Sequence, residues 1–388
     1  MVSVNTTYHV GGKDDGEKSG IAHLFEHLMF EGSPNVAHGE FDETLQMHGG
    51  DSNAFTSWDV TSYYATLPAN ALETALWLDS DRLAGFGITT EMLKIQQDVV
   101  SEERSYVFDN TPYGSVEEES NLRLFKKSGY RNSILGNMTI LKKLTIKDIR
   151  SHFDKYYAPN NAVISIAGSI DIEKTKALVE KYYGSIPVGK PFEKEKFEEY
   201  DIKEEIKDTI YDNIQLPAKF IYYRVPKLGT KDYYALNILS GILSRGESSL
   251  LNKKLVYDLT LANDADSFVS GMENTSVFGI SAVSLKGRNL DIIGEAIDET
   301  LGEIQKGNVK QEDIEKIKNK METRNSLKKS SITSIAENLS LAKIYFNDAN
   351  RINTEIYEYL AITKDDIVNA ANKYLNRNQR VVLDYLPK

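Results

Sequence analysis

The sequence predicts an α+β protein built from two homologous α/β-sandwich domains, each a mostly antiparallel sheet packed with helices. Short stretches that alternate apolar and polar residues, typical of strands, are interspersed with longer stretches of helical periodicity. Residues 144–166 align without gaps on a segment that begins at Ile362. This alignment pairs Ile149 with Ile367. Between the repeats, residues 184–208 are rich in Lys and Glu and contain Pro and Gly, as expected for a linker, so we expect a duplicated fold.

The expected domain boundaries follow from this linker. The first domain is expected over residues 1–190, the linker over residues 191–210 and the second domain over residues 211–388. A chain of 388 residues is long enough to give each of two domains its own core.

The composition is that of a soluble globular protein, with 41% hydrophobic and 27% charged residues and no apolar run of membrane-spanning length. The net charge of -11 argues against nucleic-acid partners and anionic membranes, and it is compatible with substrates that carry basic residues. The absence of Cys excludes disulfides, thiolate metal sites and Cys nucleophiles. The first residues contain no signal peptide, and the compartment, cytoplasmic or periplasmic, stays open.

In chain order, the first domain alternates strands and helices. Strands are expected over residues 2–10, 52–56, 61–67 and 162–167. Helices are expected over residues 19–32, 39–48, 69–84, 89–106, 116–127 and 171–183. Gly32 ends the first helix and Gly49 ends the second, because Gly is favoured just past a helix C-terminus.

The first of these helices carries the residues with the clearest chemistry. A helix advances about 100° per residue, so His23 and His27 lie on one face with Glu26 beside them. This H-x-x-E-H order is typical of inverzincins, in which the two His bind zinc and the Glu acts as general base. The remaining residues of the helix are apolar on nearly every side, so the helix is expected to be buried.

An ordinary core helix with hydrogen-bonded His residues is the alternative interpretation. Burying two imidazoles and a carboxylate costs several kcal/mol unless a partner satisfies all three, and a divalent cation does so. Only six His occur in 388 residues, so a chance H-x-x-E-H is rare. We therefore expect one zinc ion (Zn²⁺) per chain.

A catalytic zinc needs a third protein ligand and one open position. The helix expected over residues 89–106 places four apolar residues on one stripe, namely Met92, Ile95, Val99 and Val100. Glu103 falls in the middle of this stripe, whereas Glu102 is rotated about 100° towards its flank. Glu103 is therefore the expected ligand. Gln96 lies on the same helix face as Glu103, and its side chain can hydrogen-bond a metal ligand without binding the metal itself.

Several segments resemble the pitrilysin and mitochondrial processing peptidase family of zinc metallopeptidases. HLFEH is followed, 76 residues after its second His, by Glu103 in VVSEERS. Residues 49–68, 136–145 and 156–171 also resemble family signatures, in the expected order. The resemblance covers most of the chain and is strongest in its first half. One departure is Gln96, where the family usually has a Glu, and this puts the tuning of activity in doubt.

The resemblance implies a zinc endopeptidase that hydrolyses extended or unfolded oligopeptides within a closed chamber. His23, His27 and Glu103 would be the zinc ligands and Glu26 the general base. Substrate-binding residues are also implied, on a sheet-edge strand to which a peptide adds: Asn53, Ala54 and Phe55. A plain internal hairpin is the alternative for this strand. Family members usually carry further strands before the first residue, so the first domain is expected to lack its first strands.

The second domain repeats the fold without the chemistry. The segment IAHLFEHLMF aligns on YALNILSGIL, where Leu236, Leu239 and Ser240 replace the ligands and the base. This domain is therefore expected to bind no zinc. By the resemblance it forms the facing wall of the chamber.

The resemblance also implies a partner. In the family, an Arg and a Tyr on the second domain help to bind substrate and the developing oxyanion. Here Val256 and Asn263 align at those positions, and Lys254 and Tyr257 are close only in sequence. We therefore expect a dimer in which a related, zinc-less subunit supplies the Arg and Tyr. A homodimer or a monomer with altered catalysis is the alternative.

Two other function classes stay open. One alternative is a non-catalytic structural or assembly subunit. The other is a peptide-binding protein that holds zinc without turnover. Intact His23, Glu26, His27 and Glu103 argue against the first class.

Overall fold

The computed structural model describes residues 1–192, 194 and 196–388, which form two compact units. Unit 1 consists of Met1–Ser105, Asn132–Lys196 and Ser326–Asn353, and unit 2 of Tyr106–Arg131, Phe197–Asn325 and Thr354–Lys388. The expected linear division is therefore not followed in full. Unit 1 includes Ser326–Asn353 from the expected second domain, and unit 2 includes Tyr106–Arg131 from the expected first domain. Residues 193 and 195 of the expected linker lie outside the described residues. None of the described helices is long and apolar enough to cross a membrane.

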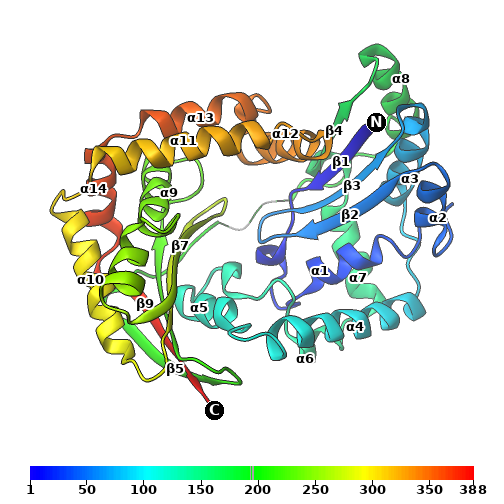
Figure 1. Ribbon diagram of the computed structural model, residues 1–388. Coiled ribbons are helices and arrows are strands. Elements are labelled where there is room, and N and C mark those ends of the chain that lie inside the picture. Colours follow the sequence, from blue (N-terminus) through cyan, green and yellow to red (C-terminus); the bar gives the residue numbers. More distant parts are fainter. Residues whose placement is uncertain (193, 195) are drawn as a thin grey trace. The chain divides into compact units, whose positions relative to one another are not determined.

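The sheet of unit 1 is antiparallel, and its strands match the predicted ones. They are β1 (Val2–Tyr8), β2 (Asp51–Thr56), β3 (Thr61–Leu67) and β4 (Ala162–Gly168). The strand order is β2-β3-β1-β4 (Figure 1). β1 is buried along its whole length, with Val4 opposite Ala65 on β3 and Ile166 on β4. Strand β2 lies at an edge of the described sheet.

Unit 1 contains helices from both halves of the chain. They are α1 (Ile21–Leu28), α2 (Glu40–Met47), α3 (Leu72–Ala84), α4 (Thr90–Arg104), α6 (Met138–Leu141), α7 (Ile146–Tyr156), α8 (Ile172–Tyr183) and α12 (Ile332–Phe346). α12 contacts β1 and β4, and Ser340 Oγ donates to Ser165 Oγ at 2.9 Å (Figure 1). The helices predicted for this region are confirmed, whereas the position of α12 was not predicted.

Unit 2 has a five-stranded sheet. Its strands are β5 (Ile206–Asp212), β6 (Ala218–Val225), β7 (Ala262–Gly271), β8 (Ser276–Ser284) and β9 (Arg380–Pro387). The order is β5-β9-β6-β8-β7, and only the pair β5 and β9 is parallel among these described strands. Helices α5 (Val116–Leu124), α9 (Lys231–Ser244), α10 (Leu290–Gln305), α11 (Gln311–Leu327), α13 (Arg351–Ala361) and α14 (Lys364–Tyr374) complete it.

The predicted repeat of residues 144–166 in the segment that begins at Ile362 is confirmed, because both segments form the same elements in the same order. Helix α7 leads through a short 3-10 turn into β4, and α14 leads through another 3-10 turn into β9. Both helices begin with the same cap: Thr145 Oγ1 accepts from the backbone of Asp148, and Thr363 Oγ1 accepts from the backbone of Asp366. Such reciprocal Thr and Asp caps satisfy backbone N–H groups that the first turn leaves unpaired.

Candidate metal centre

Helix α1 is fixed at its start by a buried carboxylate. Asp15 accepts from the backbone N–H of Gly20 at 2.6 Å and of Ala22 at 3.1 Å. Gly20 has φ of +91°, and a Cβ there would lie 2.8 Å from Gly136 Cα, so only Gly suits this position. Because its start is fixed in this way, the positions of the side chains further along α1 are defined.

The two His of α1 meet Glu103 of α4. Glu103 Oε2 lies 3.3 Å from His27 Nε2 and 3.7 Å from His23 Nε2. His23 is 8% exposed, and the Glu103 side chain is 38% exposed. Across the described residues, His23, His27 and Glu103 make up the one group of His, Cys, Asp or Glu side chains that could hold a metal ion. The residues predicted from spacing are therefore brought together.

These three side chains fit a zinc ion. Zinc holds N and O ligands at about 2.0 to 2.2 Å in tetrahedral geometry, which places neighbouring ligand atoms about 3.3 Å apart. The distances from Glu103 to both imidazoles are close to this value. Burial, together with the nearby His27, lowers the pKa of His23 to about 4, so at neutral pH His23 is the neutral imidazole that a metal requires.

The pKa values of the other two groups are shifted by their contact with each other. Burial lowers the pKa of His27, but the carboxylate of Glu103 outweighs this effect and the net shift is upward. The hydrogen bond with His27 in turn lowers the pKa of Glu103. The carboxylate of Glu103 therefore favours positive charge on the imidazole beside it.

Glu26 lies on the same helix and is 8% exposed. Thr56, at the end of β2, donates a hydrogen bond from Oγ1 to Glu26 Oε2 at 2.5 Å. Burial raises the pKa of Glu26, and the hydrogen bond from Thr56 opposes this shift. A carboxylate with a raised proton affinity is suited to accept a proton in catalysis.

The apolar stripe predicted for α4 is wrong. Ile95 is 50% exposed and Val99 is 43% exposed, and the buried residues of this helix are Leu93, Gln97 and Val100. Glu103 is thus not in the middle of a buried apolar face. Glu103 contacts the two His from the border of the buried face of α4. Gln96, seven residues earlier, lies on the same side of this helix.

Two side chains extend the site from Nδ1 of His27. They are Gln96 and Glu31, and the sequence prediction missed Glu31. Gln96 Oε1 is 3.2 Å from His27 Nδ1, and Gln96 Nε2 donates to Glu31 Oε1 at 2.6 Å. Glu31 is only 6% exposed. Its signal in the sequence is a lone carboxylate between Phe30 and Gly32, immediately after an apolar helix.

The predicted substrate-binding residues lie on β2. This strand pairs only with β3 among the described strands, so it is an edge strand rather than an internal one. Asn53 is exposed, and Ala54 and Phe55 are half-buried. The edge of β2 is thus compatible with the addition of a peptide strand, which stays a prediction.

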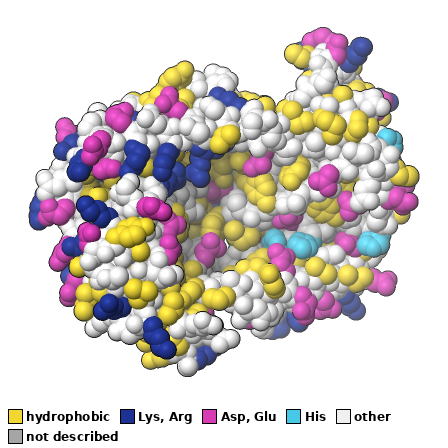
Figure 2. Space-filling model, in the orientation of Figure 1, with side chains coloured by type: hydrophobic (Ala, Val, Ile, Leu, Met, Phe, Trp, Pro, Cys, Tyr) yellow, Lys and Arg dark blue, Asp and Glu magenta, His cyan; other side chains and the backbone are white. Residues whose placement is uncertain are grey.

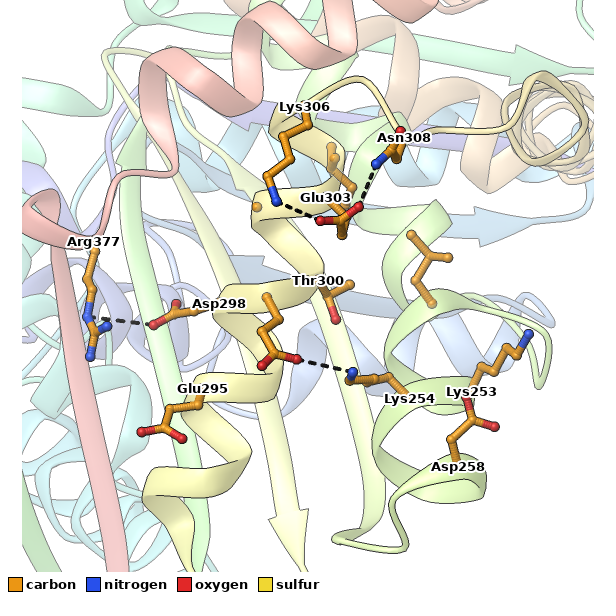
Figure 3. Close-up of a pocket in the computed structure, with 14 residues that line it drawn as sticks. Lys253, Lys254, Asp258, Glu295, Asp298, Thr300, Glu303, Lys306, Asn308 and Arg377 are labelled. Atoms are coloured by element: carbon orange, nitrogen blue, oxygen red, sulfur yellow. Dashed lines mark hydrogen bonds and ion pairs between the residues drawn. The ribbon is translucent and has the colours of Figure 1, made fainter.

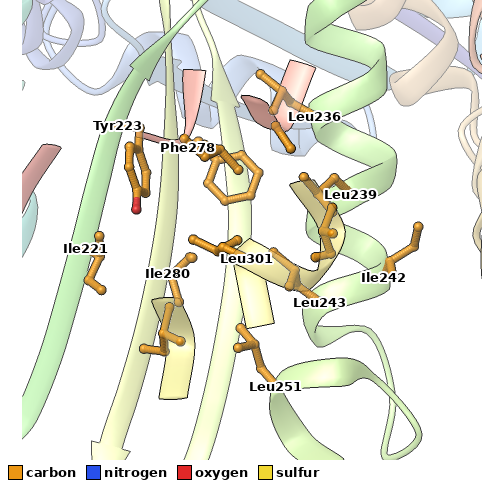
Figure 4. Packing of buried hydrophobic residues seen from close by; sticks show 14 of the residues in the cluster. Ile221, Tyr223, Leu236, Leu239, Ile242, Leu243, Leu251, Phe278, Ile280 and Leu301 are labelled. Carbon is orange, nitrogen blue, oxygen red and sulfur yellow. The ribbon is translucent and has the colours of Figure 1, made fainter. Parts of the chain in front are cut away.

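Unit 2 has two Leu and one Ser where α1 has its two His and its Glu. Leu236 and Leu239 are fully buried and Ser240 is 1% exposed, all on α9. Figure 4 shows Leu236 and Leu239 packed towards Phe278 and neighbouring core residues. Within the part of unit 2 that the structure describes, no metal-ligand group is present.

The segment aligned with the family's Arg and Tyr lies beside a cavity of about 750 Å³ in unit 2. Charged residues line this cavity and pair with one another: Lys254 with Glu299, Lys306 with Glu303, and Arg377 with Asp298 (Figure 3). Lys254 is therefore engaged, whereas Tyr257 is 58% exposed. None of the residues of the metal centre lines this cavity.

The surface charge is unevenly distributed. The net charge is -11, yet Lys and Arg side chains gather along α11 on the face shown in Figure 2. Lys320 and Arg324 are exposed residues of α11. Surface basic residues of this kind attract acidic groups through long-range electrostatics.

The order of His23, Glu26 and His27 is the H-x-x-E-H motif that is typical of inverzincin metallopeptidases. Two sequence models of one peptidase family match the chain. The model described as "Insulinase (Peptidase family M16)" matches residues 2–138, and the model described as "Peptidase M16 inactive domain" matches residues 143–321. The chain belongs to the M16 family, the pitrilysin and mitochondrial processing peptidase family that its motifs resemble.

Similar proteins extend over nearly the whole chain. The zinc protease PqqE of Helicobacter pylori is 28% identical, with 100% of this chain and 88% of that protein covered. The probable mitochondrial-processing peptidase subunit beta of Schizosaccharomyces pombe is 26% identical, with 84% and 73% covered. The crystal structure of a protease from Helicobacter pylori has a TM-score of 0.94 at 27% identity, with 100% of this chain and 94% of that chain covered.

Proposed function

We propose that this chain is a zinc-dependent endopeptidase that hydrolyses extended or unfolded oligopeptides. The observation that carries the proposal is the meeting of His23, His27 and Glu103 beside the buried carboxylate of Glu26. His23, His27 and Glu103 would hold the zinc ion. When bound, zinc supplies a Lewis acid that acidifies water and polarises a carbonyl oxygen.

Glu26 would move the proton in this reaction. Its carboxylate accepts a proton from the attacking water and then donates it to the leaving amine of the peptide. Thr56 fixes Glu26 Oε2 through the 2.5 Å hydrogen bond, so the base is held in place before substrate binds. General-base action of this kind typically contributes about 100 to 10,000-fold in rate.

The edge strand β2 would orient the substrate. A peptide that adds to this edge forms main-chain hydrogen bonds next to Asn53, Ala54 and Phe55, and this requires an extended substrate. Strand β2 ends at Thr56, which contacts Glu26. The scissile peptide bond is thereby brought to the general base by the same strand that binds the substrate.

The non-catalytic alternative is less well supported. The match to the model described as an inactive domain covers residues 143–321, which include none of the proposed catalytic residues. The match over residues 2–138 includes all four of them. We propose that residues 1–190 act as the catalytic half and residues 211–388 as a non-catalytic half.

A second subunit would complete the active enzyme. Val256 and Asn263 stand where an Arg and a Tyr are expected, and neither can take over their role, because Val has no donor and Asn is shorter than Tyr and has no phenolic hydroxyl. One relative is by its name the beta subunit of a peptidase. We therefore propose a dimer with a related, zinc-less chain that supplies the Arg and the Tyr.

Three measurements test the proposed function together. The purified chain is expected to contain one zinc ion per chain and to cleave a quenched peptide library. Addition of the zinc-less partner chain is expected to raise the cleavage rate and to give a dimer mass in solution. Zinc without cleavage, with or without the partner, would favour the peptide-binding alternative, and absence of both zinc and cleavage would favour the structural one. Full activity of the isolated chain, unchanged by any partner, would refute the heterodimer.

A further inference from the structure

A chain of hydrogen bonds leads from the metal centre to a buried carboxylate. His27 presents Nε2 to Glu103 and Nδ1 to Gln96, whose Oε1 is 3.2 Å away. Gln96 Nε2 donates to Glu31 Oε1 at 2.6 Å. His27, Gln96 and Glu31 come from α1, from α4 and from the turn after α1, so the connection is tertiary rather than local.

The direction of these hydrogen bonds is set by chemistry. An imidazole that binds a metal through Nε2 carries its proton on Nδ1, so His27 must donate to Gln96 Oε1. The amide of Gln96 then has only N–H groups left to offer, and it needs an acceptor beyond it. The carboxylate of Glu31 is that acceptor. Each hydrogen bond in such a chain polarises and strengthens the next.

Glu31 occupies a position that disfavours a carboxylate. It is 6% exposed, and burial of a charge is costly. Its backbone N–H donates to Leu28 O at the end of α1, where the helix dipole is negative. The second oxygen of Glu31 makes no hydrogen bond among the described residues, and its contact with a basic side chain is with His38 Nδ1 at 3.0 Å, on a side chain that is 65% exposed. Local structure alone gives no reason for a carboxylate here, whereas a cation bound by His27 does.

We propose that Glu31 is a positioning residue of the metal centre, which acts through Gln96 to fix the tautomer of His27 and to strengthen its binding of zinc. This inference rests on the proposed function, because it requires that His27 binds zinc. The negative charge that supports His27 is carried by Glu31, which contacts Gln96. A carboxylate at position 96 would instead contact His27 directly.

Zinc affinity measured by competition with a chelator tests this proposal without any use of activity. Glu31→Gln keeps an oxygen that accepts from Gln96 and removes the charge. We expect it to bind zinc about 10 to 100-fold more weakly than the wild-type protein, as is typical when the group behind a metal-binding His is lost. The matched control is Glu102→Gln, which removes an exposed carboxylate next to Glu103 and is expected to leave zinc affinity unchanged.

A second variant exchanges the two side chains. In Glu31→Gln combined with Gln96→Glu, the carboxylate accepts directly from His27 and the amide supports it from behind, so wild-type affinity is expected to return. Wild-type affinity in Glu31→Gln would overturn the proposal. If that variant does not fold, the exchanged variant decides: tight zinc binding supports the proposal, and weak binding in a folded protein overturns it. Absence of zinc from the wild-type protein would instead overturn the proposed function.

Discussion

The hydroxyl of Thr56 donates a hydrogen bond of 2.5 Å to Glu26 Oε2, and this contact joins the edge strand β2 to helix α1. The residue that ends the proposed peptide-binding strand is therefore the one that positions the proposed base. In the proposed mechanism, this side chain would couple substrate alignment to proton transfer.

Removal of this hydroxyl is expected to affect turnover rather than binding. Thr56→Val keeps the shape of the side chain but loses the donor, so kcat is expected to fall about 10-fold, in line with loss of one hydrogen bond to a charged group. KM and zinc content should change little. Thr56→Ser keeps the donor and serves as the control. Unchanged kcat in Thr56→Val would mean that Glu26 needs no support from β2.

The choice of the third ligand is tested by metal analysis. Glu103→Ala is expected to lower bound zinc sharply, because Glu103 Oε2 lies between the two imidazoles. Glu102→Ala should keep its zinc, since the side chain of Glu102 is exposed on the flank of α4. Equal zinc contents in the two variants would show that a different carboxylate is the ligand.

His152 is expected to make stability depend on pH. It is buried, and Nε2 of its ring has no hydrogen-bond partner among the described residues. Burial lowers the pKa of His152 to about 3, well below its unfolded value of 6.5. Below pH 6.5 the unfolded chain therefore binds a proton that the folded chain does not, and stability falls as the pH falls towards 3.

The size of this effect can be measured against a variant. From pH 6.5 to pH 5 the loss from His152 is about 2 kcal/mol, because each pKa unit corresponds to about 1.4 kcal/mol. Urea unfolding at pH 7 and pH 5 should show a smaller difference in His152→Leu than in the wild-type protein. The same difference in both proteins would assign the pH dependence to other groups.

The cap of α1 is expected to contribute to stability. Asp15→Ala leaves the backbone N–H groups of Gly20 and Ala22 without their acceptor, and loss of a helix cap typically costs about 1 to 2 kcal/mol. Thermal unfolding should show a lower Tm, by several degrees. Asp15→Asn, which keeps one acceptor oxygen, should fall between the two proteins. A wild-type Tm in Asp15→Ala would contradict the role of this carboxylate.

Local patterns in the sequence predicted the parts of the site that depend on one helix. The spacing of His23 and His27 places both on one face of any α-helix, with Glu26 beside them. Such features depend on neighbours three or four residues away. A single sequence therefore carries enough information to predict them.

Contacts between distant segments could not be predicted in this way. Helix α12 packs on β4 through Ser340 and Ser165, which are 175 residues apart, and no periodic pattern marks this pair. The stripe on α4 failed because Ile95 and Val99 are apolar yet exposed. Glu31 was missed because its partner, Gln96, lies 65 residues away in the chain. Hydrophobic periodicity indicates which residues can be buried, not what they face.

The variant Glu26→Gln tests the central claim most directly. It keeps the shape of the side chain and all three proposed zinc ligands, and it removes the base. We expect wild-type zinc content together with a loss of peptide cleavage of about 100 to 10,000-fold, measured on the same protein sample. Near wild-type cleavage by zinc-loaded Glu26→Gln would contradict the proposed mechanism.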